Sequence, residues 1–574
     1  MALCLDNQLS HLPRPLVVDP FCGGGSIPLE ALRVGPDAFA SDLNPVPVLL
    51  NKVVLEYIPK YGKRLADEVR KWGAWIKTEA EKELAEFYPK DPDGATPIAY
   101  LWARTIRCEG PACGAEVPLI RSLWLAKKAN RSVALQLVPN PKEKRVDFLI
   151  IVKEHDGWVD QSHPQTKIAN PNLDGTVKRG SATCPCCGYT TPVTSVRTQL
   201  KTRRGGAHDA RLFAVVTMRV GTQGRLYRHP TAADSDAIRH TAAELERRQS
   251  ESRRNPDGRG LSLVPDEPIS PNELRRISVP LYGMLCWGDL FAPRQALALS
   301  TLARLVRESR DQLRRDHEST LADAVGTCLA MVVGRQSDFQ SSLVTWTAGG
   351  EFAGHTFVRQ ALGMVWDFCE TNLWADASGN WDGATDWVAR VIAQEAAAGS
   401  CAGHVEQASA TQHPLPDDSA AAIVTDPPYY DAVPYAYLAD FFFVWQRRML
   451  NETHPNLFRE AGVPKAAEIV VDRPHKLSQS NKDVVFYERE LQKAFAESRR
   501  VLPHDGVATI VFTSGCLGWR AKGLSGRMRS LPVSGQRWKS SVVTVESKRR
   551  TAIRQRFANT SNTSGPLFLP KLCR

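Results

Sequence analysis

Two short apolar runs near the start of the chain each end in an acid and precede a segment with helical spacing of apolar residues. The first run, Leu16–Asp19, is followed by a glycine-rich turn and by helical spacing over residues 27–34. The second run covers residues 38–42 and is followed by a similar pattern over residues 46–54. This alternation of strand and helix predicts two successive βα units, which build a parallel sheet.

The alternation stops near residue 98 and returns only after residue 400. Between residues 98 and 280 the sequence has strand-like runs, which predict an inserted domain, at 132–137, 146–152 and 212–220. The stretch 247–280 is rich in Arg, Ser, Pro and Asp and is predicted to be a connector. Apolar spacing predicts helices over 293–315, 320–333 and 357–369.

A strand is predicted again at 420–425, followed by a helix over 487–502 and a strand over 506–513. The pattern therefore favours an α/β fold, in which a Rossmann-like parallel sheet is interrupted by an α+β insertion and then resumed. The expected parts are a first sheet segment at 1–97, the insertion at 98–280, a helical segment at 281–400, a second sheet segment at 401–515 and an atypical tail at 516–574.

The charge of the chain is unevenly distributed. Its 574 residues are 43% hydrophobic and 24% charged, with a net charge of +11, and this composition is typical of a globular protein. From Cys516 onward thirteen Lys or Arg stand against one acid, so the rest of the chain is close to neutral. A stretch with Arg197, Lys201, Arg203 and Arg204 is a better indication of a phosphate-facing surface, although an ordinary solvated face has the same pattern.

Cysteine usage and hydropathy bear on the compartment. The N-terminus has no basic flank before a long apolar run, and no later apolar stretch is long enough to span a membrane. An odd number of cysteines, thirteen, favours reduced thiols over a disulfide framework. We therefore expect a cytoplasmic protein without membrane association.

The turn after the first strand reads Asp19-Pro-Phe-Cys-Gly-Gly-Gly-Ser. Glycines at such a place let the backbone approach a ligand at the carboxyl edge of a sheet. A dinucleotide fingerprint would have a third glycine where Pro28 stands, which argues against NAD. Asp42, at the end of the next strand, is placed to accept both ribose hydroxyls of a nucleoside. The alternatives are a tight turn without ligand and, for Asp42, a turn-forming acid.

The second candidate loop is Asp426-Pro427-Pro428-Tyr429, at the end of the returning strand. An exocyclic amine is a poor nucleophile because its lone pair is delocalised into the ring. A carboxylate and a backbone carbonyl that accept its two hydrogens would favour a more pyramidal nitrogen, and the prolines stiffen the loop that aims them. Tyr429 offers a ring on which an extruded base can stack. Taken alone, the tetrapeptide could equally be a turn.

Together, the two loops resemble those of the amino-methyltransferases that modify adenine N6, cytosine N4 or guanine N2, and the aspartate form is typical of the adenine enzymes. More narrowly, the chain resembles the adenine-specific DNA methylases that contain a zinc ribbon, the DUF1156-type family, over about residues 15–513. Further matching text lies at Tyr282-Gly283, Asp289-Leu290-Phe291, Arg294-Gln295, Gln360-Ala361, Met364-Val365-Trp366-Asp367 and 426–435.

The resemblance implies a class I S-adenosylmethionine-dependent methyltransferase sheet with a zinc-ribbon insertion that takes part in target recognition. DNA is the implied partner, and companion defence or restriction proteins are left open. The site residues that it implies are Asp19, Phe21, Gly23 and Gly25 for the methionine part of the cofactor, Asp42 for its ribose, and Asp426, Pro427 and Tyr429 for the target amine. Methyl transfer by direct displacement needs no nucleophilic side chain, so Cys22 is expected to be a small packed residue.

Two pairs of cysteines in the insertion predict a structural zinc site. Cys108 and Cys113 form the first pair, and Cys184 and Cys187 form the second. Four thiolates from two such turns can hold zinc tetrahedrally, with Cys186 as the spare residue. The first pair has four intervening residues where two are usual, and reduced, partly buried thiols are the alternative.

The two ends of the chain depart from the family pattern. About fifteen residues precede the first strand, where related methyltransferases carry a segment that closes over the cofactor. At the other end, a basic segment stands in place of the final helix and strand pair. It is interpreted either as a nucleic-acid-binding tail or, preferably, as the product of a change of reading frame. Methylation of an RNA base, and nucleic-acid binding by a relative without turnover, are the alternative functions.

Overall fold

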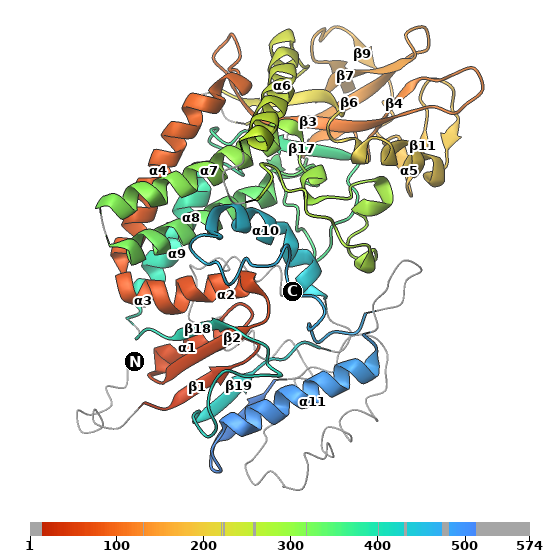
Figure 1. The fold of residues 1–574 in the computed structure, drawn as a ribbon. Helices are drawn as coiled ribbons and strands as arrows, with labels where there is room; N and C mark the ends of the chain where they lie inside the picture. The colour runs from red at the N-terminus through yellow and green to blue at the C-terminus, as the bar shows by residue number, and fades with distance from the viewer. Residues whose placement is uncertain are drawn as a thin grey trace. The chain divides into compact units, whose positions relative to one another are not determined.

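The computed structural model describes residues 14–129, 131–155, 157–219, 221, 224–255, 260–316, 318–399, 401–429, 433–472 and 482–511, and the basic tail predicted at 516–574 lies outside them. The chain divides into two compact units (Figure 1). Within the described residues, unit 1 is formed by parts of 14–68, 389–443 and 454–511, and unit 2 by parts of 69–388 and 444–453.

Unit 1 is built on a parallel sheet of five strands in the order β18-β2-β1-β19-β20. The strands are β1 (Leu16–Asp19), β2 (Asp37–Asp42), β18 (His404–Gln407), β19 (Ala422–Thr425) and β20 (Val507–Ile510). From β1 the chain moves outward through β2 to β18, and it then returns to the other side of β1 as β19 and β20. The strand order therefore reverses between β1 and β19. In open α/β sheets, such a reversal leaves a ligand crevice at the carboxyl ends of the two strands.

The helices of unit 1 include α1 (Ser26–Val34), α2 (Pro45–Asn51), α3 (Ile58–Tyr61) and α11 (Val484–Val501). Figure 1 shows α1 alongside β1 and β2, and a π-helical turn, Lys52–Tyr57, joins α2 to α3. At the end of α11, Val501 and Leu502 pack against Val18 and Ile423 in the sheet core. The predicted succession of strand, helix and strand is thus confirmed for β1, α1 and β2, and for β19, α11 and β20.

Unit 2 contains several further sheets. The first has the order β14-β13-β3-β17, with β4 also paired to β3; its strands are β3 (Thr96–Arg107), β4 (Glu116–Leu119), β13 (Arg211–Met218), β14 (Leu226–Arg228) and β17 (Asp367–Thr371). The second is formed by β5 (Trp124–Lys128), β6 (Arg131–Asn140), β7 (Arg145–Glu154), β8 (Gly157–Asp160) and β9 (Lys167–Ile168). The others are β10 (Val177–Lys178), β11 (Ser181–Thr183) and β12 (Thr190–Thr191), and the pair β15 (Trp346–Thr347) and β16 (Phe352–Ala353).

The helices of this part of the chain are α5 (Val193–Lys201), α6 (Ala232–Arg254), α7 (Pro293–Asp316) and α8 (Ser319–Phe339). The two predicted helices over 293–315 and 320–333 are confirmed as α7 and α8. The helices α5 and α6 were not predicted, and neither were α4 (Lys63–Leu84), α9 (Trp381–Ala397) and α10 (Tyr435–Leu450). No helix among the described residues is both long enough and apolar enough to cross a membrane.

Two predicted elements of unit 2 are wrong. The segment 357–369 is not a helix but a series of turns that leads into β17, where Phe368 stacks on Trp102 of β3 with parallel ring planes. The amide of Leu362 donates to Arg276 and its carbonyl accepts from Ser278, so a helix could not use these groups. Strand pairing has overridden the helical spacing of apolar residues.

The stretch 247–280 is also not a connector throughout, because α6 continues to Arg254. The arginines that suggested a linker are paired along one helix face. Arg247 contacts Glu244 and Glu251 at 2.7 and 2.9 Å, and Arg248 contacts Glu244 at 2.7 Å. Ion pairs three and four residues apart favour the helix.

Candidate functional site

The glycine loop leads from the end of β1 into α1, which begins at Ser26. Gly23 and Gly25 have φ angles of 46° and 79°, in the left-handed region where glycine is favoured. A Cβ atom on Gly25 would lie 2.1 Å from Asn51 Oδ1, so this position excludes any side chain for a second reason. The loop therefore lies close to α2. Because these residues are glycines, a ligand could approach the loop backbone closely.

Asn51 anchors the loop and was not identified from the sequence. Its fully buried side chain donates from Nδ2 to the carbonyls of Gly23 and Pro47, both at 2.9 Å. Among the described residues its Oδ1 atom has no hydrogen-bond partner. The signal in the sequence was a polar residue in an apolar segment that follows the second strand.

Asp42 lies next to the glycine loop. Its Oδ2 accepts from the amide of Gly23 at 3.0 Å, and its Oδ1 accepts from the amide of Asn44 at 2.9 Å. Burial raises the pKa of this carboxyl to about 6, although the backbone donors at Asn44 and Gly23 oppose the shift. The acid at the end of β2 is thus hydrogen-bonded directly to the glycine loop that follows β1.

Asp19 joins the glycine loop to the second candidate loop. Its Oδ1 accepts from the hydroxyl of Thr425, the residue before Asp426, at 2.7 Å, and from the amide of Phe21 at 3.1 Å. Burial raises the pKa of Asp19 to about 7, these two donors lower it, and the charges of Asp42 and Asp426 raise it further. The charges of Asp42 and Asp426 thus both act on the carboxyl of Asp19.

The Asp-Pro-Pro-Tyr loop follows β19, and residues 430–432 after it lie outside the described chain. The hydroxyl of Tyr429 donates to Asp426 Oδ1 at 2.7 Å. Partial burial raises the pKa of Asp426, and the bond from Tyr429 opposes the shift. Pro427 is buried, and the carbonyl of Pro428 accepts from the hydroxyl of Tyr487 in α11 at 2.8 Å.

Tyr487 connects this loop to the glycine loop, and it too was not identified from the sequence. It is buried in a cluster with Ile469 and Leu491, and Phe21 of the glycine loop packs against the same cluster. Cys22, in contrast, is buried, and burial raises the pKa of its thiol, as expected for a packed residue rather than a nucleophile.

The two cysteine pairs of the insertion converge in unit 2. Cys108 and Cys113 flank the turn between β3 and β4, and Cys184 and Cys187 lie in the turn between β11 and β12. Their four sulfur atoms lie within 4.8 Å of one another, with Cys108 and Cys187 at 3.5 Å and Cys113 and Cys184 at 3.8 Å. Tetrahedral zinc with Zn–S bonds of about 2.3 Å requires sulfur atoms roughly 3.8 Å apart. The cluster could therefore bind a metal ion, and its geometry is compatible with structural zinc.

Backbone turns shape this cluster. The amide of Gly110 donates to Cys108 Sγ at 3.3 Å, and a Cβ atom on Gly110 would lie 3.0 Å from Cys187 Sγ. The spare residue, Cys186, is turned away and donates from Sγ to the carbonyl of Arg145 at 3.4 Å. The four predicted ligands are thus brought together, and the fifth cysteine is not among them.

The basic stretch beside the cluster makes contacts within unit 2. Arg203 donates to the carbonyl of Thr105 at 2.6 Å, Arg204 forms an ion pair with Asp289, and the guanidinium of Arg197 lies 5.4 Å from the ring centroid of Tyr282. Lys201 is exposed. The ion pair of Arg204 with Asp289 reduces the charge that the stretch offers to a phosphate.

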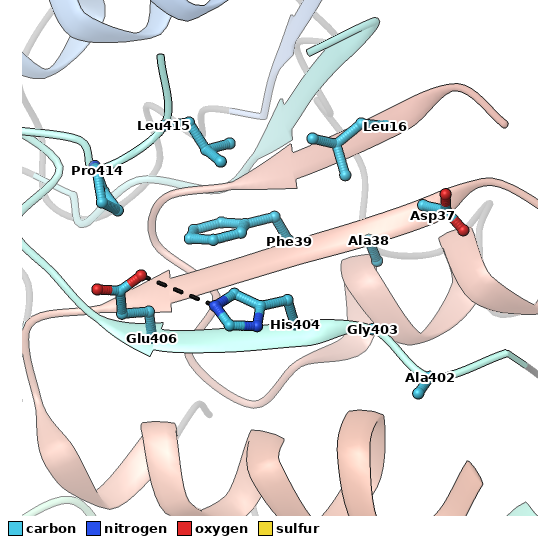
Figure 2. Close-up of a pocket in the computed structure, with 10 residues that line it drawn as sticks. All are labelled: Leu16, Asp37, Ala38, Phe39, Ala402, Gly403, His404, Glu406, Pro414 and Leu415. Carbon is cyan, nitrogen blue, oxygen red and sulfur yellow. Dashed lines mark ion pairs between the residues drawn. The ribbon is translucent and has the colours of Figure 1, made fainter. Parts of the chain in front are cut away.

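A hollow of about 470 Å³ lies elsewhere on the sheet of unit 1 (Figure 2). It is lined near the amino ends of the strands, by Leu16 of β1, Asp37 of β2 and His404 of β18 among others. Figure 2 shows the ring of Phe39 beside His404, and the two ring centroids are 5.2 Å apart. None of the predicted site residues lines this hollow.

Comparisons of the chain with protein-family models, with curated proteins and with solved structures each found no match. Its function therefore has to be inferred from the geometry of the two loops and of the cysteine cluster.

Proposed function

We propose that the chain is an S-adenosylmethionine-dependent methyltransferase of Rossmann-like class I architecture, which methylates the N6 amine of adenine in DNA. One observation carries the proposal: the loop after β1 and the loop after β19 meet where the strand order reverses, and the bond from Thr425 to Asp19 joins them. A nucleoside cofactor and a second substrate can meet at such a point.

The glycine loop and Asp42 are the proposed cofactor residues. Asp42 accepts ribose hydroxyls, while Asp19, Phe21, Gly23 and Gly25 surround the methionine part. The presence of Pro28 where a dinucleotide fingerprint has its third glycine favours this cofactor over NAD. S-adenosylmethionine would supply an electrophilic methyl group beside the carboxyl end of β1.

The Asp-Pro-Pro-Tyr loop is the proposed site of the target amine. Asp426 and a backbone carbonyl of the loop, that of Pro427, accept the two amine hydrogens, which localises the lone pair on nitrogen. With its lone pair localised, the nitrogen would take the methyl group, S-adenosylhomocysteine would leave, and the extra proton on nitrogen would pass to water. Orientation of the two reactants provides much of the acceleration.

The hydroxyl of Tyr429 donates a hydrogen bond to Oδ1 of Asp426, the proposed acceptor of an amine hydrogen. An incoming amine that donates to Oδ1 would compete with the phenolic hydroxyl for that oxygen. The released tyrosine ring then offers a face for stacking of the extruded base. The cysteine cluster, with zinc bound, would stabilise the insertion and take no part in methyl transfer.

Transfer of tritium from labelled S-adenosylmethionine to DNA and to RNA tests the proposal, with Asp426→Ala as the matched inactive variant. We expect label in DNA adenine with the unsubstituted chain and none with Asp426→Ala. Label in RNA alone would assign the same site to an RNA base. Cofactor binding without transfer would indicate a nucleic-acid-binding relative, and absence of cofactor binding would refute the proposal.

A further inference from the structure

Glu468 is an acid of unit 1 whose neighbour in the chain, Ile469, packs in the same cluster as Phe21 of the glycine loop. Its Oε1 atom accepts from the amide of Ala436, in the first turn of α10, at 2.9 Å. The surrounding loop is fixed by Asp440, which accepts from the amide of Val463 at 2.8 Å and pairs with Lys465 at 2.7 Å. The carboxyl group of Glu468 is therefore held in a defined position.

The other oxygen of this carboxyl, Oε2, is buried and has no hydrogen-bond partner among the described residues. Burial raises the pKa of Glu468 to about 7, the amide of Ala436 and the charge of Lys482 lower it, and the charges of Asp472 and Asp42 raise it. A buried carboxylate oxygen without a donor is costly, so a donor from outside the chain would be bound there favourably.

Asp42 alone has limited capacity for a ribose. Each of its two oxygens already accepts one backbone amide, from Gly23 and from Asn44. Ribose presents two neighbouring hydroxyl donors, and a carboxylate oxygen with both lone pairs free is the stronger acceptor for one of them. Glu468 Oε2 is such an atom, it belongs to the segment that packs with Phe21 of the glycine loop, and the charge of Asp42 raises the pKa of Glu468.

We propose that Glu468 is a second acidic ribose contact, whose Oε2 accepts a hydrogen bond from one ribose hydroxyl of the cofactor held beside Asp42. The inference rests on the proposed function, because it takes the ligand at Asp42 to be a nucleoside cofactor. Glu468 is a binding residue and does not touch the reacting methyl group. Its place about forty residues beyond the catalytic loop explains why no motif in the sequence marks it.

Calorimetry with S-adenosylhomocysteine and with its 2′-deoxy and 3′-deoxy forms tests the contact, at about pH 8.5 so that the carboxyl is ionised. With the unsubstituted chain, loss of the hydroxyl that Glu468 holds should weaken binding at least about tenfold. Glu468→Gln should weaken binding of S-adenosylhomocysteine by a similar factor. In that variant, removal of the same hydroxyl should change affinity less than about twofold.

Asp440→Asn is the matched control, because it removes a carboxylate from the same loop while the amide oxygen can still accept from Val463, so that Glu468 stays in place. It should preserve the full dependence on the ribose hydroxyl. If Glu468→Gln lowered the affinity equally for S-adenosylhomocysteine and its two deoxy forms, the ribose contact would be overturned. Unchanged affinity of this variant for S-adenosylhomocysteine would overturn it as well. Failure of the unsubstituted chain to bind any of them would overturn the proposed cofactor as well, so the two failures are distinguishable.

Discussion

The hydroxyl of Thr425 donates a hydrogen bond of 2.7 Å to Oδ1 of Asp19, and both side chains are buried. The two residues end the neighbouring parallel strands β19 and β1, although they lie 406 positions apart in the chain. The bond fixes the start of the Asp-Pro-Pro-Tyr loop against the start of the glycine loop. It also gives a buried acid one of its few polar partners, and this has a measurable consequence for stability.

We expect Asp19→Asn to change the pH dependence of stability. The pKa of Asp19 is raised by burial to about 7, above its value of about 3.8 in the unfolded chain. The folded state thus binds a proton that the unfolded state releases between these values, so this contribution to stability is present below about pH 4 and is lost as the pH rises through about 7. The variant should be more stable than the unsubstituted chain at pH 8, by roughly 1–3 kcal/mol.

Urea unfolding between about pH 4 and pH 8 measures this difference. Asp505→Asn removes the same charge from an exposed position of unit 1 and should leave the pH dependence unaltered. Parallel pH profiles for Asp19→Asn and the unsubstituted chain would show that Asp19 titrates normally in the folded protein.

Gly25→Ala should disrupt the glycine loop. The new Cβ atom would lie 2.1 Å from Asn51 Oδ1, in addition to the strain of a φ angle of 79°. Gly35→Ala is the matched control, since Gly35 has a φ angle of 110° and no atom within 4 Å of the position of a Cβ. We expect Gly25→Ala to cost at least about 2 kcal/mol more than Gly35→Ala and to abolish cofactor binding. Equal costs would mean that Asn51 can move aside freely.

The elements that the sequence predicted well are those in which local pattern and tertiary role agree. Leu16–Asp19 and Ala422–Thr425 are short apolar strands between turn residues, and α11 has a helical pattern whose buried face meets the sheet. The helix predicted over 357–369 was wrong because pairing of β17 with β3, which is 260 or more positions away in the chain, decides its structure. Such a partner leaves no local signal.

The residues of the candidate site likewise include some that the sequence identified and others that it did not. Its motif residues could be named from the two loops, because glycines and prolines at strand ends have a local meaning. Asn51, Tyr487 and Glu468 could not, since each acts through a tertiary contact: with Gly23, with Pro428 and with Ala436 respectively. The four cysteines were found because two close pairs in one insertion already suggest a tetrahedral site.

Zinc content can be tested with serine variants of the second cysteine pair. The purified chain should hold about one zinc, and Cys184→Ser or Cys187→Ser should lose it, because each removes one of four converging sulfur atoms. We expect these variants to lower the unfolding midpoint by more than about 5 °C, as metal binding contributes folding energy. Cys186→Ser is the control and should keep the metal, since the Cys186 thiol donates a hydrogen bond to the carbonyl of Arg145 and is not one of the four converging sulfur atoms. Metal analysis that finds no zinc after reducing, chelator-free purification would refute the site.

Asp426→Ala should abolish methyl transfer while cofactor affinity changes by less than about twofold. The variant removes the carboxylate that accepts an amine hydrogen, and it leaves Asp42 and the glycine loop unaltered. Loss of such a contact costs about 3–4 kcal/mol or more in the transition state. Single-turnover transfer and calorimetry separate the two effects. An undiminished rate of adenine methylation would place the catalytic site elsewhere.

Tyr429→Phe and Tyr429→Ala distinguish the two roles of the tyrosine. The phenylalanine variant keeps the ring for stacking and removes only the hydroxyl that donates to Asp426 Oδ1, so it should retain most of the activity. The alanine variant should bind the target base about tenfold more weakly.

The hydroxyl of Tyr429 also lowers the pKa of Asp426, which partial burial raises. Its removal should raise that pKa and move the acidic limb of the rate profile to higher pH, since transfer requires the ionised carboxylate. A rate profile for Tyr429→Phe that is shifted to lower pH, or an activity as low as that of Tyr429→Ala, would show that the hydroxyl takes a direct part in the reaction.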